Sequence, residues 1–251
     1  MAVFSDVHGN SIALDAVLAD VERVGGVDAY WFVGDAAALG FDPVGTIKRL
    51  ADLPGLVAVR GNTDRNTVED TQEVDAEFVS LAAHDPGRAR TRFMILRNFA
   101  WTRGAVTAGG GFDWLAGLPL EERMKLPDGT RVLLVHAAPS TDDGPGIREE
   151  HSDDELNEML VDAAADLVIV GHTHKALDRT VHGVRVFNLG SVSIPQTDEL
   201  RAMWTLLEAD ERGYRLERQF VAYDSVEMLR RLGMATPPAE STIRTFWERG
   251  S

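Results

Sequence analysis

Seven carboxylate, amide and imidazole side chains stand directly after predicted strands, where they could bind metal ions. They are Asp6, His8, Asp35, Asn62, His136, His172 and His174. In open α/β sheets, ligands bind beyond the carboxyl ends of the strands, so we expect these side chains to meet at one sheet edge. The set contains four of the seven histidines in the chain, and five strand ends contribute to it. Chance is therefore a poor explanation of the pattern.

The donor atoms of this set are all oxygen and nitrogen, which suits divalent transition metals. Asp6-x-His8 and His172-x-His174 each place two donors on one side of an extended segment. Seven donors exceed the roughly four ligands of a tetrahedral zinc ion. They fit two ions about 3.5–4 Å apart that share one carboxylate and a water. Taken singly, each residue has a structural alternative: a helix cap, a turn or a hydrogen-bonded histidine.

Strands and helices alternate in the part of the chain that must position these side chains. Strands are predicted at 1–5, 29–33 and 56–59, and helices are predicted to begin near Ser11 and at Pro43. The first helix has apolar residues at helical spacing and stops at a Gly-Gly pair, whereas the second opens with Asp-Pro. This βαβαβ order is typical of a mostly parallel, layered α/β sheet.

The middle of the chain differs, because residues 66–125 contain no clear strand. Helices are predicted at 73–83 and 89–101, which indicates a helical cap insertion over the sheet edge. Six aromatic residues in this region either pack the cap onto the domain, the commoner role for such residues, or line a substrate cleft. They are Phe78, Phe93, Phe99, Trp101, Phe112 and Trp114.

Strands resume after the insertion, and the chain is expected to form one domain over 1–251. The later strands are predicted at 131–135, 167–170, 184–188, 202–208 and 214–222, the last three as an antiparallel set. A capping box at Ser152 starts a helix between the first two of them. Two helices are predicted to end the chain, near 225–232 and 240–249.

Composition excludes several classes of function. The net charge of −15 and the pI near 4.8 oppose non-specific binding to nucleic acid or to membranes. There is no cysteine, so disulfides and thiolate ligands are absent. No apolar run is long enough for a membrane span, and the N-terminus does not look like a signal peptide. We therefore expect a cytoplasmic protein, and the abrupt start of the first strand suggests that a residue or two of it precede the given sequence.

These motifs together resemble the calcineurin-like metallophosphoesterases. That family has Asp-x-His, Gly-Asp, Gly-Asn-His-Glu/Asp, a lone His and Gly-His-x-His in this order. The corresponding segments of this chain are Asp6-Val-His8, Gly34-Asp35, Gly61-Asn-Thr-Asp64, His136 and Gly171-His-Thr-His174. The stretch FNLGSVSIPQ at 187–196 is also similar to the small bacterial phosphodiesterase branch of the family.

The resemblance implies a four-layer α/β/β/α sandwich and two divalent transition-metal ions, manganese first, with iron, zinc, nickel or cobalt as alternatives. One ion would be held by Asp6, His8, Asp35 and His174. The other would be held by Asp35, Asn62, His136 and His172, with Asp35 bridging. A hydroxide bridging the metals would then attack the phosphorus in line.

One residue departs from the family pattern. Thr63 occupies the position of a histidine that is proposed to protonate the leaving group. Because threonine can hydrogen-bond but cannot act as a general acid near neutral pH, we expect leaving groups that need little protonation. Asp64 and His8 are candidates for relaying a proton. Asn10, Thr63 and Arg65 are candidate substrate contacts, although a helix cap and a surface cation are equally good roles for Asn10 and Arg65.

The expected function is hydrolysis of a phosphodiester or phosphoanhydride in a small molecule or nucleotide. The alternatives are a serine/threonine-type protein phosphatase, a phosphomonoesterase and, from another class, a non-catalytic interaction module like the retromer scaffold subunit. That subunit has a degraded metal site, whereas all seven ligand positions are intact in this chain. The sequence leaves the oligomeric state open.

Overall fold

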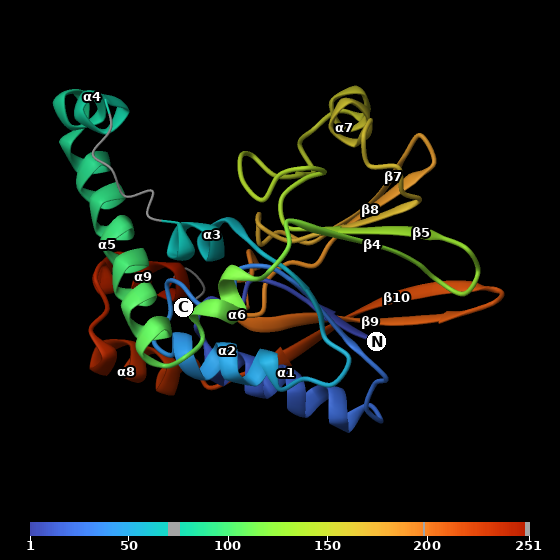
Figure 1. The fold of residues 1–251 in the computed structure, drawn as a ribbon, viewed down its shortest axis with the longest axis horizontal. Helices are drawn as coiled ribbons and strands as arrows, with labels where there is room; N and C mark the ends of the chain where they lie inside the picture. The colour runs from blue at the N-terminus through green and yellow to red at the C-terminus, as the bar shows by residue number, and fades with distance from the viewer. Residues whose placement is uncertain (70–75, 198, 249–251) are drawn as a thin grey trace.

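The computed structural model describes residues 1–69, 76–197 and 199–248. Two five-stranded sheets lie face to face, and helices cover their outer faces (Figure 1). Within the described ranges, no helix combines the length and the apolar character needed to cross a lipid bilayer.

The first sheet has the strand order β10-β9-β1-β2-β3. Its strands are β1 (Ala2–Phe4), β2 (Tyr30–Val33), β3 (Val57–Val59), β9 (Arg201–Asp210) and β10 (Gly213–Ala222). The first three run parallel, as their βαβαβ order predicted, whereas β9 pairs antiparallel with both β1 and β10. The carboxyl ends of the three parallel strands therefore lie at one edge.

The second sheet has the strand order β4-β5-β6-β8-β7. Its strands are β4 (Glu121–Lys125), β5 (Arg131–Val135), β6 (Leu167–Val170), β7 (Leu177–Val181) and β8 (Val184–Asn188). β5, β6 and β8 run parallel, and the two edge strands are antiparallel to their neighbours. The expectation that 184–188 joins the last two strands in one antiparallel set is therefore wrong.

Successive side chains along each strand point to opposite faces of the sheet, and this divides the interior into layers. Phe4 packs in a cluster with Leu14 of α1 (Ser11–Arg23), whereas its neighbour Val3 packs against the second sheet. In the second sheet, Ile169 faces the first sheet, and Val168 packs under α7 (Asp153–Leu160). The helix α2 (Pro43–Ala51) lies beside α1 on the outer face of the first sheet (Figure 1). The predicted α/β/β/α sandwich is confirmed.

Helices follow the first sheet's third strand, as expected for the insertion. They are α3 (Asn62–Val68), α4 (Ala76–His84), α5 (Pro86–Ala108) and α6 (Phe112–Ala116). The start of the helix predicted at 73–83 lies outside the described residues. The boundary near 125 is wrong, because β4 is an edge strand of the second sheet and the helices end at Ala116. In Figure 1, α4 and α5 project away from the sheets.

The C-terminal helices lie beside the cap rather than in the sandwich. They are α8 (Ser225–Ala235) and α9 (Glu240–Glu248), and residue 249 of the predicted last helix lies outside the described residues. Their apolar residues, among them Met228, Ile243 and Trp247, form a separate cluster with Ile194 from the loop after β8. This cluster places α8 and α9 against the loop that follows β8.

Candidate metal centre

Three of the predicted ligands form a tight group at the edge of the two sheets. Ligand atoms of Asp6, His8 and His174 lie within 4.8 Å of one another. The Oδ1 of Asp6 is 3.1 Å from the Nε2 of His174 and 3.7 Å from the Nε2 of His8. The two Nε2 atoms are themselves 3.1 Å apart. Two imidazole nitrogens can face each other at that distance only if one donates an N–H hydrogen to the other or a metal ion lies between them.

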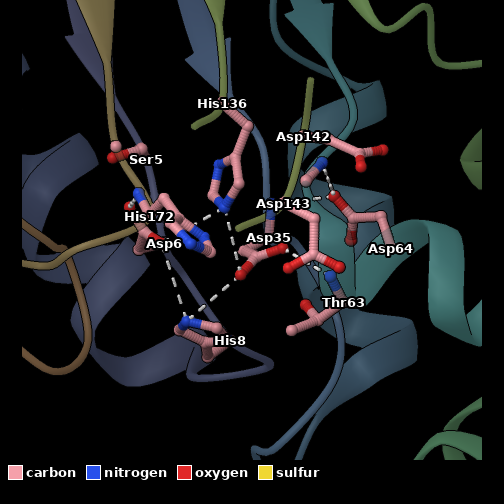
Figure 2. Close-up of polar contacts among 12 residues, drawn as sticks. Ser5, Asp6, His8, Asp35, Thr63, Asp64, His136, Asp142, Asp143 and His172 are labelled. Atoms are coloured by element: carbon pink, nitrogen blue, oxygen red, sulfur yellow. Dashed lines mark hydrogen bonds and ion pairs between the residues drawn. The ribbon is translucent and has the colours of Figure 1, made fainter. Parts of the chain in front are cut away.

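A second group overlaps the first and consists of Asp6, Asp35 and His136. The Nε2 of His136 is 3.4 Å from the Oδ2 of Asp35 and 3.9 Å from the Oδ1 of Asp6. That same Asp35 oxygen is 3.7 Å from the Nε2 of His8. Figure 2 shows His8 and His136 on opposite sides of Asp35, both turned toward it. Asp35 thus contacts a histidine of each group, as its expected bridging role requires.

Backbone carbonyls hold three of the histidine rings in one tautomer. The Nδ1 of His136 lies 2.8 Å from the Val33 oxygen, and the Nε2 of His172 lies 2.9 Å from the Gly144 oxygen. Because a ring nitrogen that donates to a carbonyl carries the proton, the other nitrogen keeps its lone pair. The lone pair of His136 is then on Nε2, which faces Asp6 and Asp35. The Nδ1 of His8 lies 3.3 Å from the Ala38 oxygen, which leaves its Nε2 free in the same way.

The centre contains polar atoms that a metal ion would satisfy. In the described part of the chain, the Oδ1 of Asp6 and the Nε2 of His136 are buried without a hydrogen-bond partner. A buried polar atom that lacks a partner costs about 1–3 kcal/mol, so evolution rarely leaves one unsatisfied. Both atoms are of ligand type, and each belongs to a group spaced for a cation. The residues present therefore fit the expected metal ions.

Buried charges shift the pKa values in the centre. Burial lowers the pKa of His8 to about 4, so its ring is neutral near pH 7. Burial also opposes charge on His136, but Asp35 and Asp6 outweigh it and raise the pKa of His136 to about 10. The charge of His136 in turn holds the pKa of Asp35 below its usual range, against the effect of burial. Without metal, protons on histidines thus balance the two carboxylates, and metal ions would displace them.

Five ligands adopt the left-handed backbone region, which residues other than glycine rarely enter. Their φ angles are 58° for Asp6, 48° for His8, 64° for Asp35, 67° for His172 and 57° for His174. Each such residue costs about 1–3 kcal/mol, and such strain clusters at functional sites. The motif glycines allow the close packing. A Cβ on Gly171 would lie 2.5 Å from the Oδ2 of Asp6, and one on Gly61 would collide with Asp35.

The remaining two predicted ligands line the cavity beside these groups. Asn62 is the first residue of α3, so the Gly-Asn-Thr-Asp segment is a helix start as well as a turn. Asn62 and His172 both line a cavity of about 260 Å³ together with His8, Asp35 and His174. The ring of His172 meets that of His136 edge on, with their centroids 5.2 Å apart. All seven predicted ligands therefore lie at or beside one centre.

The Asp64 carboxylate is held by backbone amides. It is fully buried and accepts hydrogen bonds from the backbone N–H groups of Asp35, Ala36 and Gly61 at 2.8–2.9 Å. Burial and the charge of Asp35 raise the pKa of Asp64 to about 7. Because both oxygens are engaged by amides, Asp64 ties the loop after β2 to the loop after β3. This geometry gives Asp64 a positioning role, and its part in relaying a proton stays a prediction.

Two of the three predicted substrate contacts have structural roles. The Oδ1 of Asn10 caps α1 by accepting from the Ala13 N–H, and its Nδ2 donates to Ser193 at 3.0 Å. Asn10 is fully buried and both ends of its amide are engaged within the protein, so its role is that of a helix cap. Arg65 donates through Nε to Asp142 at 3.0 Å and through a terminal nitrogen to Asp143 at 2.8 Å.

The acidic pair Asp142 and Asp143 was not recognised from the sequence, because an acid in a polar loop carries no signal of its own. These two residues precede Gly144, whose carbonyl holds the ring of His172. Arg65 therefore steadies the loop that orients a metal ligand, and it does not point a free cation at the substrate.

Thr63 is the predicted contact that does face the cavity. Its backbone N–H donates to the Oδ1 of Asp35 at 2.9 Å. Its hydroxyl is buried and has no partner in the described residues, and the residue lines the cavity. Thr63 thus places an unpaired, buried hydroxyl beside the predicted metal ligands, and its contact with substrate stays a prediction.

The sequence and the fold both match known proteins. The model of the calcineurin-like phosphoesterase superfamily domain matches residues 1–212. An uncharacterized protein of Methanocaldococcus jannaschii is 26% identical over 242 residues, which cover 89% of this chain and 88% of the relative.

Two solved structures share the fold over their whole length. A hypothetical protein from Pyrococcus horikoshii has a TM-score of 0.79 at 20% identity, over 100% of this chain and 98% of that one. A metallophosphoesterase from Sphaerobacter thermophilus has a TM-score of 0.72 at 23% identity, with the same coverage of 100% and 98%.

Proposed function

This chain belongs to the calcineurin-like phosphoesterase family, and from that premise we propose that it is a dimetal-dependent phosphoesterase acting on phosphodiester or phosphoanhydride bonds. One observation carries the proposal. Two groups of ligand atoms overlap at Asp6, Asp35 of one group lies 3.7 Å from His8 of the other, and two of the ligand atoms are buried without a hydrogen-bond partner. Such atoms are what a pair of divalent cations would satisfy.

The first ion would be held by Asp6, His8, Asp35 and His174, and the second by Asp35, Asn62, His136 and His172. When bound, two divalent ions would supply an activated water and a net positive site for phosphate within an acidic chain. The chain's own residues orient the ligands through the carbonyls of Val33, Ala38 and Gly144. The Thr63 hydroxyl would donate a hydrogen bond to a phosphate oxygen.

The choice of bond follows from the residues beside the leaving group. Thr63 cannot protonate it, Asp64 is engaged by backbone amides, and His8 is neutral with its free nitrogen facing the ligands. A leaving group must therefore depart largely as an anion, which favours nucleoside phosphates and activated phenols over alkyl alcohols. This reasoning supports diesters and anhydrides over alkyl monoesters.

A manganese-supplemented substrate panel tests the proposal. It contains p-nitrophenyl phosphate, its bis-ester, cyclic nucleotides and diadenosine tetraphosphate, with an alkyl monoester and a phosphoserine peptide for comparison. We expect hydrolysis of the bis-ester or of diadenosine tetraphosphate to exceed that of an alkyl monoester. His136→Ala should lose this activity, whereas His84→Ala, which changes an exposed histidine on α4, should keep it.

Three results would count against the proposal or its ligand assignment. Faster hydrolysis of alkyl monoesters or phosphoserine peptides would favour a monoesterase or a protein phosphatase. A purified protein without bound transition metal that cleaves nothing in the panel would favour a non-catalytic, retromer-like module. Full activity of His136→Ala would refute the ligand assignment.

A further inference from the structure

The cavity at the metal centre has an apolar wall that binding and cleaving a phosphate do not require. The metal ligands line the cavity together with Asn62 and Thr63. Leu39, Ile194 and Phe246, which belong to one apolar cluster, also line it and are called the apolar wall here. Apolar side chains beside a phosphate site do nothing for the charged group, so they must face another part of the substrate or simply close the cavity.

Phe246 reaches the cavity from α9, and a hydrogen bond from the neighbouring Trp247 ties that helix to Ser193 in the loop after β8. The Nε1 of Trp247 and the hydroxyl of Tyr223 both donate to the backbone oxygen of Ser193, at 2.9 and 2.8 Å. The backbone N–H of Ser193 in turn donates to the oxygen of Asp6 at 3.1 Å. The Phe246 ring is therefore held in a fixed place relative to a metal ligand, and it remains partly exposed.

Leu39 reaches the same wall at the cost of backbone strain. Its φ is 77°, a left-handed value that bulky side chains rarely adopt. The fully buried Asn98 of α5 holds it there, because its Oδ1 accepts from the Leu39 N–H at 3.0 Å. The Nδ2 of the same Asn98 donates to the oxygen of Pro238, just before α9, at 3.1 Å. The buried Asn98 side chain thus links the backbone at Leu39 to the backbone just before α9, which carries Phe246. The strained backbone at Leu39 supports a functional reason for holding these two residues together.

We propose that Leu39, Ile194 and Phe246 form a subsite for the nucleobase of a nucleotide whose phosphate lies on the metal centre. The inference rests on the proposed phosphoesterase function and names its substrate class. A partly exposed phenyl ring offers a face on which any base can stack, and two aliphatic neighbours complete a flat apolar surface. Gln196 is exposed on the same cavity and brings an amide that can pair with a base edge.

The aromatic member of the subsite lies outside the part of the chain that the family model matches. That model ends at residue 212, whereas Phe246 lies on α9 beyond it. Of the two roles considered for the six cap aromatics, lining this cavity is not seen among the described lining residues, where the aromatic side chain is that of Phe246.

Binding of two ligands that differ only in the base tests the inference. Calorimetry with the manganese-loaded protein should give a Kd for AMP about tenfold lower than for ribose 5-phosphate, as expected for one stacked base. Phe246→Ala should remove most of that preference while leaving the Kd for ribose 5-phosphate unchanged. Phe246→Tyr should keep the preference, and so should Phe93→Ala, which truncates an exposed aromatic side chain on α5.

A second variant covers the case in which Phe246→Ala does not fold. Leu39→Gly removes a side chain of the wall and suits the positive φ, so it should fold and lose part of the preference for AMP. Equal binding of AMP and ribose 5-phosphate by the wild type would overturn the inference, as would full preference in Phe246→Ala.

The binding test of the subsite and the activity test of the proposed function can fail independently. A protein that prefers AMP but hydrolyses no phosphate ester supports the subsite and refutes the esterase. A protein that hydrolyses the bis-ester but does not distinguish the two ligands refutes the subsite alone.

Discussion

Replacing Asp6 with asparagine should remove more than half of the stabilisation by metal while leaving the metal-free fold nearly unchanged. Asp6 is the carboxylate common to both ligand groups, and it is fully buried. A ligand at one hundred times its Kd stabilises a protein by about 2.7 kcal/mol, so two independent ions would contribute about 5.4 kcal/mol. In a chain of this size, 1 kcal/mol shifts Tm by about 2–4 °C, so the wild type should gain about 10–20 °C with manganese.

The assay is calorimetric melting of chelated and manganese-loaded protein. Asp6→Asn keeps the size of the side chain and an oxygen that can accept from the His172 N–H, so the chelated variant should melt close to the chelated wild type. Its gain with manganese should fall to less than half of the wild-type gain. Asp15→Asn removes the same charge from an exposed helix position and should retain the full gain. The reasoning is refuted if Asp6→Asn gains as much as the wild type.

Three further outcomes follow from the same geometry. Asn10→Ala should lower the free energy of unfolding in urea by about 1–2 kcal/mol, because α1 loses its cap, yet keep the rise in Tm with manganese. Arg65→Ala should weaken manganese binding by calorimetry about tenfold, because it frees the loop that orients a ligand, whereas Arg131→Ala in an exposed ion pair should not. Manganese uptake at pH 7 should release protons, and affinity should fall as the pH is lowered, since a pKa of about 10 keeps His136 protonated without metal, and, against the effect of burial, Asp6 raises the pKa of His174. A pH-stat that records no proton release would contradict this last expectation.

The positions of the candidate metal ligands could be predicted because these residues follow strands. The parallel strands β1, β2 and β3 end at a common edge, so the residues just after them lie together at that edge. The roles of Asn10 and Arg65 were not predictable, because their partners Ser193 and Asp142 lie far away in the sequence. Only the folded chain shows that these two polar groups are already engaged.

The sequence did not predict β4 and β7, and the position of these strands explains why. β4 and β7 lie at the two edges of the second sheet, where one side of the strand has no partner. Edge strands carry charged residues that discourage pairing with other chains, and β4 reads Glu-Glu-Arg-Met-Lys. An apolar pattern therefore could not reveal them. Phe246 was missed for a related reason: it lies far from every motif, and only the packing of α9 brings it to the cavity.

The central claim is that two metal ions at this centre enable phosphoester hydrolysis. Titration of the chelated protein with manganese, while hydrolysis of bis-p-nitrophenyl phosphate is followed, tests it most directly. We predict no hydrolysis without metal and a rise to a plateau at two equivalents of manganese per chain. Hydrolysis that survives chelation, or its absence at two bound equivalents, would contradict the claim.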